Sequence, residues 1–355
     1  MKAKLALWTT GMLAAAVAAF SVNVSAHSEH EGKAVKSGEQ DELVIYTSRK
    51  EHLVKPLFEQ YTAKTGTQIR YITDKAGPLI ARLETEGQNT PADMLITVDA
   101  GNLWQASSKN LLQPVESTVL ENNIPAHLRS EQKDWYGLSV RARTLVYASD
   151  RLKESDLVGY EDLADSRWKG RLCLRTSKKV YNQSLVATMI ERLGEEKTEQ
   201  VVQGWVNNLA APVFSNDTKA MQAVAAGVCD VTVVNTYYFG RLQKKNPDTN
   251  LKVFWANQSA EGENSSGVHV NISGAGVTRH AGNPAGAQAF LEWMSTEEAQ
   301  RIIADMNMEY PAKADSQPSD VVGSWGEFRA DDLNVAAAGA KQARAIQLMD
   351  KVSYK

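Results

Sequence analysis

Short apolar runs and longer stretches of helical periodicity alternate along residues 42–98. Three runs, "ELVIYTS" (42–48), "TQIRYIT" (67–73) and "ADMLITV" (92–98), have the length and composition of strands. Between them, "KEHLVKPLFEQYTAKTG" (50–66) and "PLIARLETEG" (78–87) repeat apolar residues at helical spacing and close on glycine. The order strand, helix, strand, helix, strand predicts a parallel α/β layer.

The same alternation returns in the second half of the chain and predicts a second α/β layer. Strands are expected at "GRLCLRTS" (170–177) and "CDVTVVNT" (229–236), and helices at "QSLVATMIERLG" (183–194) and "TKAMQAVAAG" (218–227). The C-terminal segments 285–306 and 330–352 are helical by period and composition.

A chain of 355 residues with two such layers predicts an α/β protein of two lobes. We expect lobe 1 to comprise residues 41–142 plus about 268–315. Lobe 2 is then expected to comprise residues 143–267 plus about 316–355.

The first 26 residues form a segment that is separable from these lobes. They have a basic start, an apolar stretch and a small-residue end at Ala26, which are the three parts of a secretory signal peptide. A membrane anchor, the alternative, needs about 20 apolar residues, and the uninterrupted apolar part is shorter. We therefore expect export to the periplasm with cleavage after Ala26, no stable membrane insertion, and a flexible tether over residues 27–40.

Charge and motif content narrow the class of function. Without the signal segment, 37 basic side chains stand against 42 acidic ones, which gives no reason to expect a nucleic acid as partner. The sequence lacks the nucleophile elbow, the phosphate-binding loop, the dinucleotide fingerprint and the zinc-protease motif. We therefore expect a binding protein and not an enzyme.

The two cysteines, Cys173 and Cys229, suggest how the second layer is arranged. In an exported chain an even count indicates one disulfide, and the alternative is a pair of buried free thiols. Eight residues beyond each cysteine stands a tyrosine, Tyr181 and Tyr237. If the two strands are parallel neighbours, both tyrosines reach the carboxyl edge of the sheet, where open α/β sheets bind ligands. Otherwise the bridge is only structural and the equal spacing is chance.

The stretch "VVNTYYFGRL" (233–242) places Tyr237 and Tyr238 directly after an apolar run. Asn235 and Thr236 are good helix N-caps, so both phenols are expected in a first helical turn, where the helix dipole favours an anion. The alternative is ordinary aromatic packing at a lobe junction. If Tyr181 joins the pair, three phenols match a hard, highly charged cation such as Fe(III), whereas Zn(II) prefers His and Cys.

The chain resembles the multi-tyrosine branch of the periplasmic ferric-ion-binding proteins of ABC importers. The resemblance runs from about Leu43 to Ala312, and these stretches carry it: "LVIYTSRKE", "TPADMLITVDAGNLW", "DWYGLSVRARTLVY", "GRLCLRTSKKVYNQS", "VVNTYYFGRL" and "NMEYPA". It implies a two-lobed class II periplasmic binding fold, with a hinge and with Fe(III) held in the cleft between the lobes.

The resemblance also implies roles for particular residues. Tyr237 and Tyr238 match the family's paired phenolate ligands, and Tyr181 matches a further tyrosine ligand of this branch. Arg141 matches an arginine that holds a synergistic anion such as carbonate, and it matches better than Arg143. A salt bridge at the hinge is the alternative for Arg141.

One ligand region departs from the family pattern. Relatives carry His-Tyr or a histidine shortly after the first strand, where this chain has Lys50-Glu51. Glu51 is therefore a candidate Fe(III) ligand, or else a solvated acid that pairs with Lys55. The acidic ligand of the His-Glu branch aligns near Val98, which cannot coordinate a metal, so the chain is placed in the tyrosine branch.

These expectations combine into an exported, monomeric receptor that binds Fe(III) and delivers it to an ABC permease for iron uptake. The closest competing hypothesis is a receptor for a small organic anion, clamped by Arg141 and Arg143. An exported hydrolase and an iron-storage protein without a transport role are further alternatives.

Overall fold

The structure is a computed structural model, and it describes residues 42–262 and 264–355. The predicted signal peptide and tether (1–40) lie outside the described residues. The strands are β1 (Glu42–Thr47), β2 (Gln68–Thr73), β3 (Met94–Val98), β4 (Tyr136–Ala148), β5 (Leu172–Cys173), β6 (Val231–Asn235), β7 (Leu251–Phe254), β8 (Val270–Val277) and β9 (Tyr310–Pro311). The helices are α1 (Glu51–Thr65), α2 (Ala76–Glu86), α3 (Ala100–Ser108), α4 (Thr118–Asn123), α5 (Val180–Leu193), α6 (Glu195–Asn207), α7 (Asp217–Ala225), α8 (Thr236–Lys245), α9 (Pro284–Met294), α10 (Glu297–Asn307), α11 (Asp320–Gly323), α12 (Ala336–Ala340) and α13 (Gln342–Lys351).

The first α/β layer is built as its apolar pattern predicts. β1 pairs in parallel with β2 and with β3, and α1 ends at Gly66, whose left-handed backbone closes the helix. β8, which returns from late in the chain, then joins β3 in the antiparallel sense. The sheet is therefore mixed and not purely parallel.

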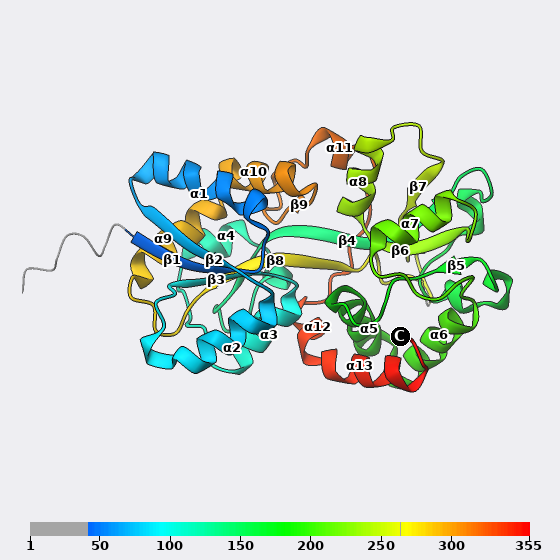
Figure 1. The fold of residues 1–355 in the computed structure, drawn as a ribbon, viewed down its shortest axis with the longest axis horizontal. Coiled ribbons are helices and arrows are strands. Elements are labelled where there is room, and N and C mark those ends of the chain that lie inside the picture. Colours follow the sequence, from blue (N-terminus) through cyan, green and yellow to red (C-terminus); the bar gives the residue numbers. More distant parts are fainter. Residues whose placement is uncertain (1–41, 263) are drawn as a thin grey trace, which may run out of the picture. The chain divides into compact units, whose positions relative to one another are not determined.

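The long strand β4 connects the two halves of the molecule (Figure 1). Its first part pairs with β8 and β9, and its second part pairs with β6 and β7. The change of partner falls between Arg141, which lies opposite Asn271 of β8, and Arg143, which lies opposite Asn235 of β6. Both arginines therefore stand where the two halves meet.

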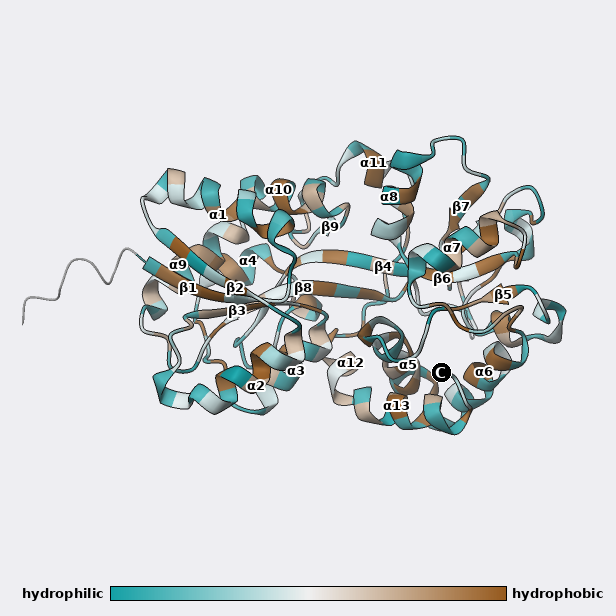
Figure 2. Ribbon diagram, in the orientation of Figure 1, coloured by the Kyte–Doolittle hydropathy of each residue, from teal (hydrophilic) through white to brown (hydrophobic). Residues whose placement is uncertain are grey.

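The two halves have separate hydrophobic cores, and we call them lobe 1 and lobe 2. The core of lobe 1 draws on residues 43–142 and 268–312 together with Val335, and lobe 2 draws on residues 145–256 and 345–354. Figure 2 shows the apolar character concentrated in the strands of the sheet, with hydrophilic residues along the outer helices. The exact lobe boundaries stay a prediction; Val335 packs in the first core although its range was assigned to lobe 2.

Lobe 2 contains the predicted disulfide. Cys173 and Cys229 are bonded, with a Cα–Cα distance of 5.9 Å, and β5 pairs with β6 in parallel. β5 is only two residues long, shorter than the predicted strand 170–177. α5 begins at Val180, three residues before the predicted start at Gln183, so Tyr181 lies inside the helix.

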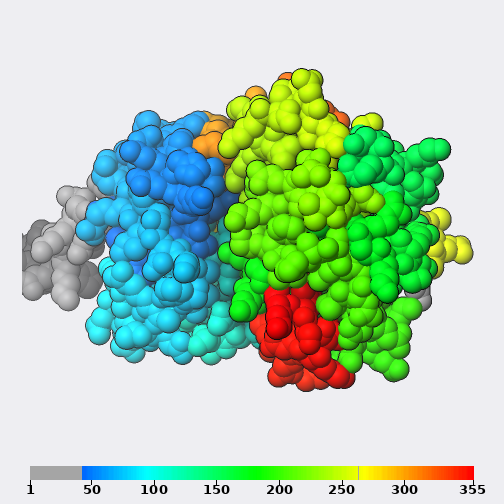
Figure 3. All heavy atoms as spheres, turned by 45° about the vertical axis from the view of Figure 1, so that its right-hand side comes forward, coloured from blue at the N-terminus to red at the C-terminus, as the bar shows by residue number. Residues whose placement is uncertain are grey.

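The C-terminal helices pack beside the lobe junction. α12 contacts both α3 and α5, and α13 contacts α5 and α6. Figure 3 shows the surface of lobe 1, in blue and cyan, meeting the green and red surface of lobe 2. Within the described part of the chain, none of the helices combines the length and the apolar character that a membrane span requires.

Candidate functional site

Three tyrosines from two helix starts come together in lobe 2. Tyr181 is the second residue of α5, Tyr237 is the second residue of α8, and Tyr238 follows it. The side chains of Tyr237 and Tyr181 are close enough for each to affect the pKa of the other. The ring centroids of Tyr237 and Tyr238 are 4.4 Å apart. The structure thus brings all three phenols into one cluster.

The parallel pairing of β5 and β6 is present, but the equal eight-residue spacing is not what aligns the tyrosines. The register places Cys173 opposite Thr232, not opposite Cys229. The tyrosines meet because each occupies the first turn of the helix that follows its strand. The parallel pairing of the two strands was predicted from the sequence, whereas their register was not.

From its position in the sequence, Asn235 is expected to cap helix α8, but in the structure its side chain contacts Tyr237 instead. It is the N-cap residue of α8, but its side chain makes no capping bond. Its amide nitrogen instead donates to the Tyr237 hydroxyl at 3.1 Å, and its amide oxygen accepts from Arg143 at 3.0 Å. The N-cap residue therefore holds the phenol toward the other tyrosines.

Arg143 belongs to the scaffold of lobe 2. Its guanidinium is buried, pairs with Asp217 at 3.1 Å, and donates to Asn182 and Asn235. Because these partners are all protein groups inside lobe 2, Arg143 is occupied in holding α5, α7 and β6 together.

Arg141 lies beside the tyrosines and is also buried, with 2% of its surface exposed. It pairs with Asp99 at 3.0 Å and donates to the backbone oxygen of Ile272. Its guanidinium carbon is 5.2 Å from the ring centroid of Tyr181. This pair is the hinge salt bridge that was the alternative for Arg141, and the anion contact stays a prediction.

Asp99 is a site residue that the sequence reasoning missed. Besides pairing with Arg141, its carboxylate accepts a hydrogen bond of 2.6 Å from Ser184, so it links lobe 1 to α5 of lobe 2. Its backbone has φ 77°, a region that a non-glycine residue occupies only at a cost of about 1–3 kcal/mol. The available signal was an aspartate between the apolar run of β3 and the start of α3, where it caps the helix at Gly101.

Without a bound cation, the surroundings of the cluster favour the protonated form of the Tyr181 and Tyr237 phenols. Burial raises the pKa of Tyr181 and raises that of Tyr237 well above its ordinary value, while Arg141 opposes both shifts. The Arg241 guanidinium carbon lies 5.0 Å from the Tyr237 ring centroid, and the Lys179 ammonium lies 5.3 Å from that of Tyr181. Two cationic side chains therefore flank a set of three phenols, of which Tyr181 and Tyr237 are buried and Tyr238 is partly buried.

Glu51 lies at the exposed start of α1. It accepts a hydrogen bond of 2.9 Å from the hydroxyl of Tyr71, and Lys55 pairs with Glu59 instead. The structure does not place it beside the tyrosines, and its role as a ligand stays a prediction.

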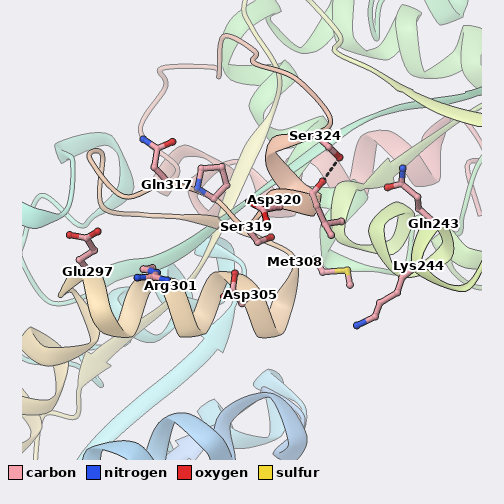
Figure 4. A pocket seen from close by; sticks show the side chains of 12 residues that line it. Gln243, Lys244, Glu297, Arg301, Asp305, Met308, Gln317, Ser319, Asp320 and Ser324 are labelled. Atoms are coloured by element: carbon pink, nitrogen blue, oxygen red, sulfur yellow. Dashed lines mark hydrogen bonds between the residues drawn. The ribbon is translucent and has the colours of Figure 1, made fainter. Parts of the chain in front are cut away.

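A pocket of about 380 Å³ opens next to the cluster and is lined from both lobes. Lobe 1 contributes residues such as Ser48 and Asn102, and lobe 2 contributes Lys179 and Val180, the two residues before Tyr181. A second pocket of about 840 Å³ lies between α8, α10 and the segment around α11 (Figure 4). Its charged groups come mostly from α10. No tyrosine lines either pocket, but the lining of the smaller one includes Lys179 and Val180, which directly precede Tyr181.

Two α/β lobes that share a long strand, with a pocket lined from both of them near the tyrosine cluster, are the architecture of the two-lobed periplasmic binding proteins. The chain belongs to the family described as bacterial extracellular solute-binding protein, whose profile matches residues 56–330.

The names of individual relatives are more specific than the family description, because they mention iron. The chain is 40% identical to Iron uptake protein A1 of Synechocystis sp. (strain ATCC 27184 / PCC 6803 / Kazusa) over 324 residues, which cover 90% of this chain and 89% of the relative. It is 38% identical to Iron uptake protein A2 of the same organism over 90% of this chain and 92% of the relative. Among solved structures, Trichodesmium IdiA (FutA) in complex with iron and citrate ligands is similar with a TM-score of 0.83 and 41% identity, covering 88% of this chain and 100% of that one.

Proposed function

We propose that this protein is an exported solute receptor that binds Fe(III) between its lobes and delivers it to an ABC permease for iron uptake. The observation that carries the proposal is the cluster of Tyr181, Tyr237 and Tyr238 beside a pocket lined from both lobes. The names of the related iron uptake proteins support it.

The tyrosines would act as phenolate ligands. Three phenolates balance the charge of Fe(III), so a neutral cluster can form in a partly buried site at a small desolvation cost. Asn235 orients Tyr237, and the Arg141 guanidinium beside Tyr181 stabilises the phenolate form. The hinge motion that closes the lobes would bring a donor from lobe 1 onto the ion, for which Glu51 is the candidate.

Arg141 remains the candidate contact for a synergistic anion such as carbonate. Of its five N–H donors, one bonds Asp99 and one bonds Ile272 among the described residues. An anion that joined the metal beside Tyr181 would therefore find further donors on the same guanidinium.

Export, cleavage after Ala26 and docking of the closed form on a permease complete the proposed pathway. The proposed lobe boundaries are 41–142 with 268–315 and 143–267 with 316–355, and the two cores support them except around Val335, which packs in the core of lobe 1. The receptor is proposed to act as a monomer.

Metal analysis and a visible spectrum of the protein loaded with ferric citrate test the proposal. We expect one iron per chain and a phenolate-to-Fe(III) charge-transfer band. A colourless protein that ferric citrate does not stabilise, but that an iron-free organic anion does, would contradict the proposal and support the organic-anion receptor. The position of Arg143 inside lobe 2 already weighs against a two-arginine clamp.

A further inference from the structure

The side chain of Asn235 lies between a buried arginine and one of the proposed iron ligands. Its amide oxygen is 3.0 Å from a guanidinium nitrogen of Arg143, and its amide nitrogen is 3.1 Å from the hydroxyl oxygen of Tyr237. All three side chains are buried, so water has little access to these contacts. Asn235 therefore links Arg143 to the tyrosine cluster.

The arginine determines which end of the amide faces the tyrosine. A guanidinium has N–H donors and no acceptor, so only the amide oxygen of Asn235 can bind Arg143. The amide nitrogen then faces Tyr237 and donates to its oxygen. A flipped amide would put its N–H groups against the guanidinium and lose that hydrogen bond. Asn235 is thus fixed as a hydrogen-bond donor toward Tyr237.

The surroundings of Arg143 keep this arrangement in place. Its guanidinium is held by Asp217 at 3.1 Å and by the backbone oxygen of Val233 at 3.0 Å. The backbone N–H of Asn235 donates to the same aspartate at 3.3 Å. These contacts fix the guanidinium and the amide relative to each other behind Tyr237.

The buried charges behind Tyr237 do not cancel. Asp217 pairs with Arg143 and also with Arg175, at 3.3 Å. In the part of the chain that the structure describes, neither arginine forms an ion pair with a second carboxylate. These three side chains therefore carry one net positive charge, which favours a negative charge on a nearby oxygen. The amide of Asn235, polarised by Arg143, conveys this preference to Tyr237.

The hydroxyl of Tyr237 differs in this respect from those of the other two tyrosines. Arg141 and Lys179 lie over the ring of Tyr181, at 5.2 and 5.3 Å from its centroid. Among the described residues, an amide side chain donates to the hydroxyl of Tyr237 and not to that of Tyr181 or Tyr238. The three proposed ligands are therefore not equivalent.

A hydrogen bond donated to a phenolate oxygen withdraws electron density from it. The phenolate then donates less strongly to a metal, and hydrogen bonds to metal-bound atoms are a known means of setting reduction potentials. Because Fe(III) carries one more positive charge than Fe(II), it loses more when a ligand donates less. The hydrogen bond from Asn235 should therefore raise the reduction potential of iron that Tyr237 binds.

We propose that Asn235 is a positioning residue that weakens electron donation by the Tyr237 phenolate, and that its hydrogen bond sets how strongly the site prefers Fe(III) to Fe(II). This inference rests on the proposed function, because it concerns Fe(III) bound by the tyrosines. It gives Arg143 an effect on the iron through the amide of Asn235, without direct contact.

The test compares Asn235→Ala and Asn235→Leu with the wild type. Both variants remove the donor without adding a charge, and alanine, being smaller than asparagine, fits the site if leucine prevents folding. Asn208→Ala is the matched control, because Asn208 is a buried asparagine of lobe 2 whose amide donates two hydrogen bonds, to the backbone oxygens of Leu163 and Asp165. Each protein is loaded with ferric citrate. Iron content, the visible band and the reduction potential, from a spectroelectrochemical titration, are then measured.

We expect both Asn235 variants to keep iron and to show the band at longer wavelength, because the phenolate electrons are held less tightly. The ratio of Fe(III) to Fe(II) affinity should rise about tenfold, which is a fall of about 59 mV in the reduction potential. The control should keep the wild-type values.

An unchanged potential in Asn235→Ala, or an equal fall in Asn208→Ala, would overturn the inference. Loss of tight iron binding by Asn235→Ala would also overturn it, because the asparagine would then only hold the ring in place. Absence of the band from the wild type would instead refute the proposed function.

Discussion

Two arginines two residues apart on β4 have different surroundings, and this difference decides their roles. Arg143 is enclosed by Asp217, Asn182 and Asn235, whereas Arg141 lies against Tyr181 and Asp99. Residues i and i+2 of a strand point to the same side, so the pair "RAR" brings both side chains to the lobe junction. Only tertiary packing shows which one reaches the site.

Replacing Arg143 tests its role in the scaffold. Arg143→Ala leaves the buried Asp217 with Arg175 alone, at 3.3 Å, and we expect the free energy of unfolding to fall by about 3–5 kcal/mol. Arg344→Ala, which breaks an exposed pair with Glu195, should change it by less than about 1 kcal/mol. Urea titration followed by circular dichroism measures both variants, and an equal effect would show that Arg143 is not structural.

Protonation of the tyrosines should couple iron binding to pH. Because burial raises the pKa of Tyr181 and of Tyr237, both phenols hold their protons at neutral pH and must release them to Fe(III). We expect at least two protons released per iron and an affinity that rises with pH. A pH-stat titration with ferric citrate, from which a titration of the same complex without protein is subtracted, counts these protons, and Tyr181→Phe should lower the count by about one. Binding without proton release would show that phenolates are not the ligands.

At the scale of elements, the first turns of α5 and α8 carry the three tyrosines of the cluster. Residues from outside α8 pack against the next turn of this helix. A Cβ at Gly240 would lie 2.8 Å from a ring carbon of Trp325 and 3.0 Å from the sulfur of Met308. The Trp325 indole also donates to Gln243 at 3.0 Å. Close packing of the indole on Gly240 therefore fixes the helix that carries Tyr237 and Tyr238.

Gly240→Ala should displace either Trp325 or α8. We expect a loss of about 1–3 kcal/mol in stability from overpacking, together with weaker iron binding. Gly77→Ala in α2 is the matched control, because its Cβ meets nothing within 4 Å. Thermal unfolding and iron titration of both variants check this, and equal behaviour of the two would contradict the packing argument.

The disulfide holds β5 near β6 and closes a loop with a sequence separation of 56 residues. On the chain-entropy estimate, a loop of this length is worth about 4 kcal/mol. We expect Cys173→Ser/Cys229→Ser to lower the free energy of unfolding by up to this amount and to leave the iron band in the folded fraction. Loss of the band from folded protein would mean that the bridge also positions the tyrosines.

At the scale of the whole molecule, the periodicity of apolar residues predicted the local helices and strands. Features that depend on contacts between distant parts of the chain were not predicted. The apolar runs of β1 and β3 and the glycine closure of α1 are local features, so the sequence located them. β4 was not predicted, because its two buried arginines interrupt the apolar pattern. Asp99 was missed because its partners, Arg141 and Ser184, are distant in the chain.

The tyrosine cluster was predicted by combining residue type with family resemblance, while its geometry depends on where α5 and α8 begin after their strands. The link from Asp99 to Ser184 shows that the two lobes also touch directly beside the site. Closure over a ligand would therefore act on the same group that holds Arg141.

The central claim is that Tyr237 and Tyr238 bind Fe(III) as phenolates. The most direct measurement is the visible spectrum and iron content of Tyr237→Phe/Tyr238→Phe after loading with ferric citrate, beside Tyr61→Phe/Tyr147→Phe, which removes two hydroxyls from the cores of the lobes. We expect the first variant to lose the charge-transfer band and tight iron binding, and the second to keep both. Stoichiometric Fe(III) with an unchanged band in Tyr237→Phe/Tyr238→Phe would contradict the account.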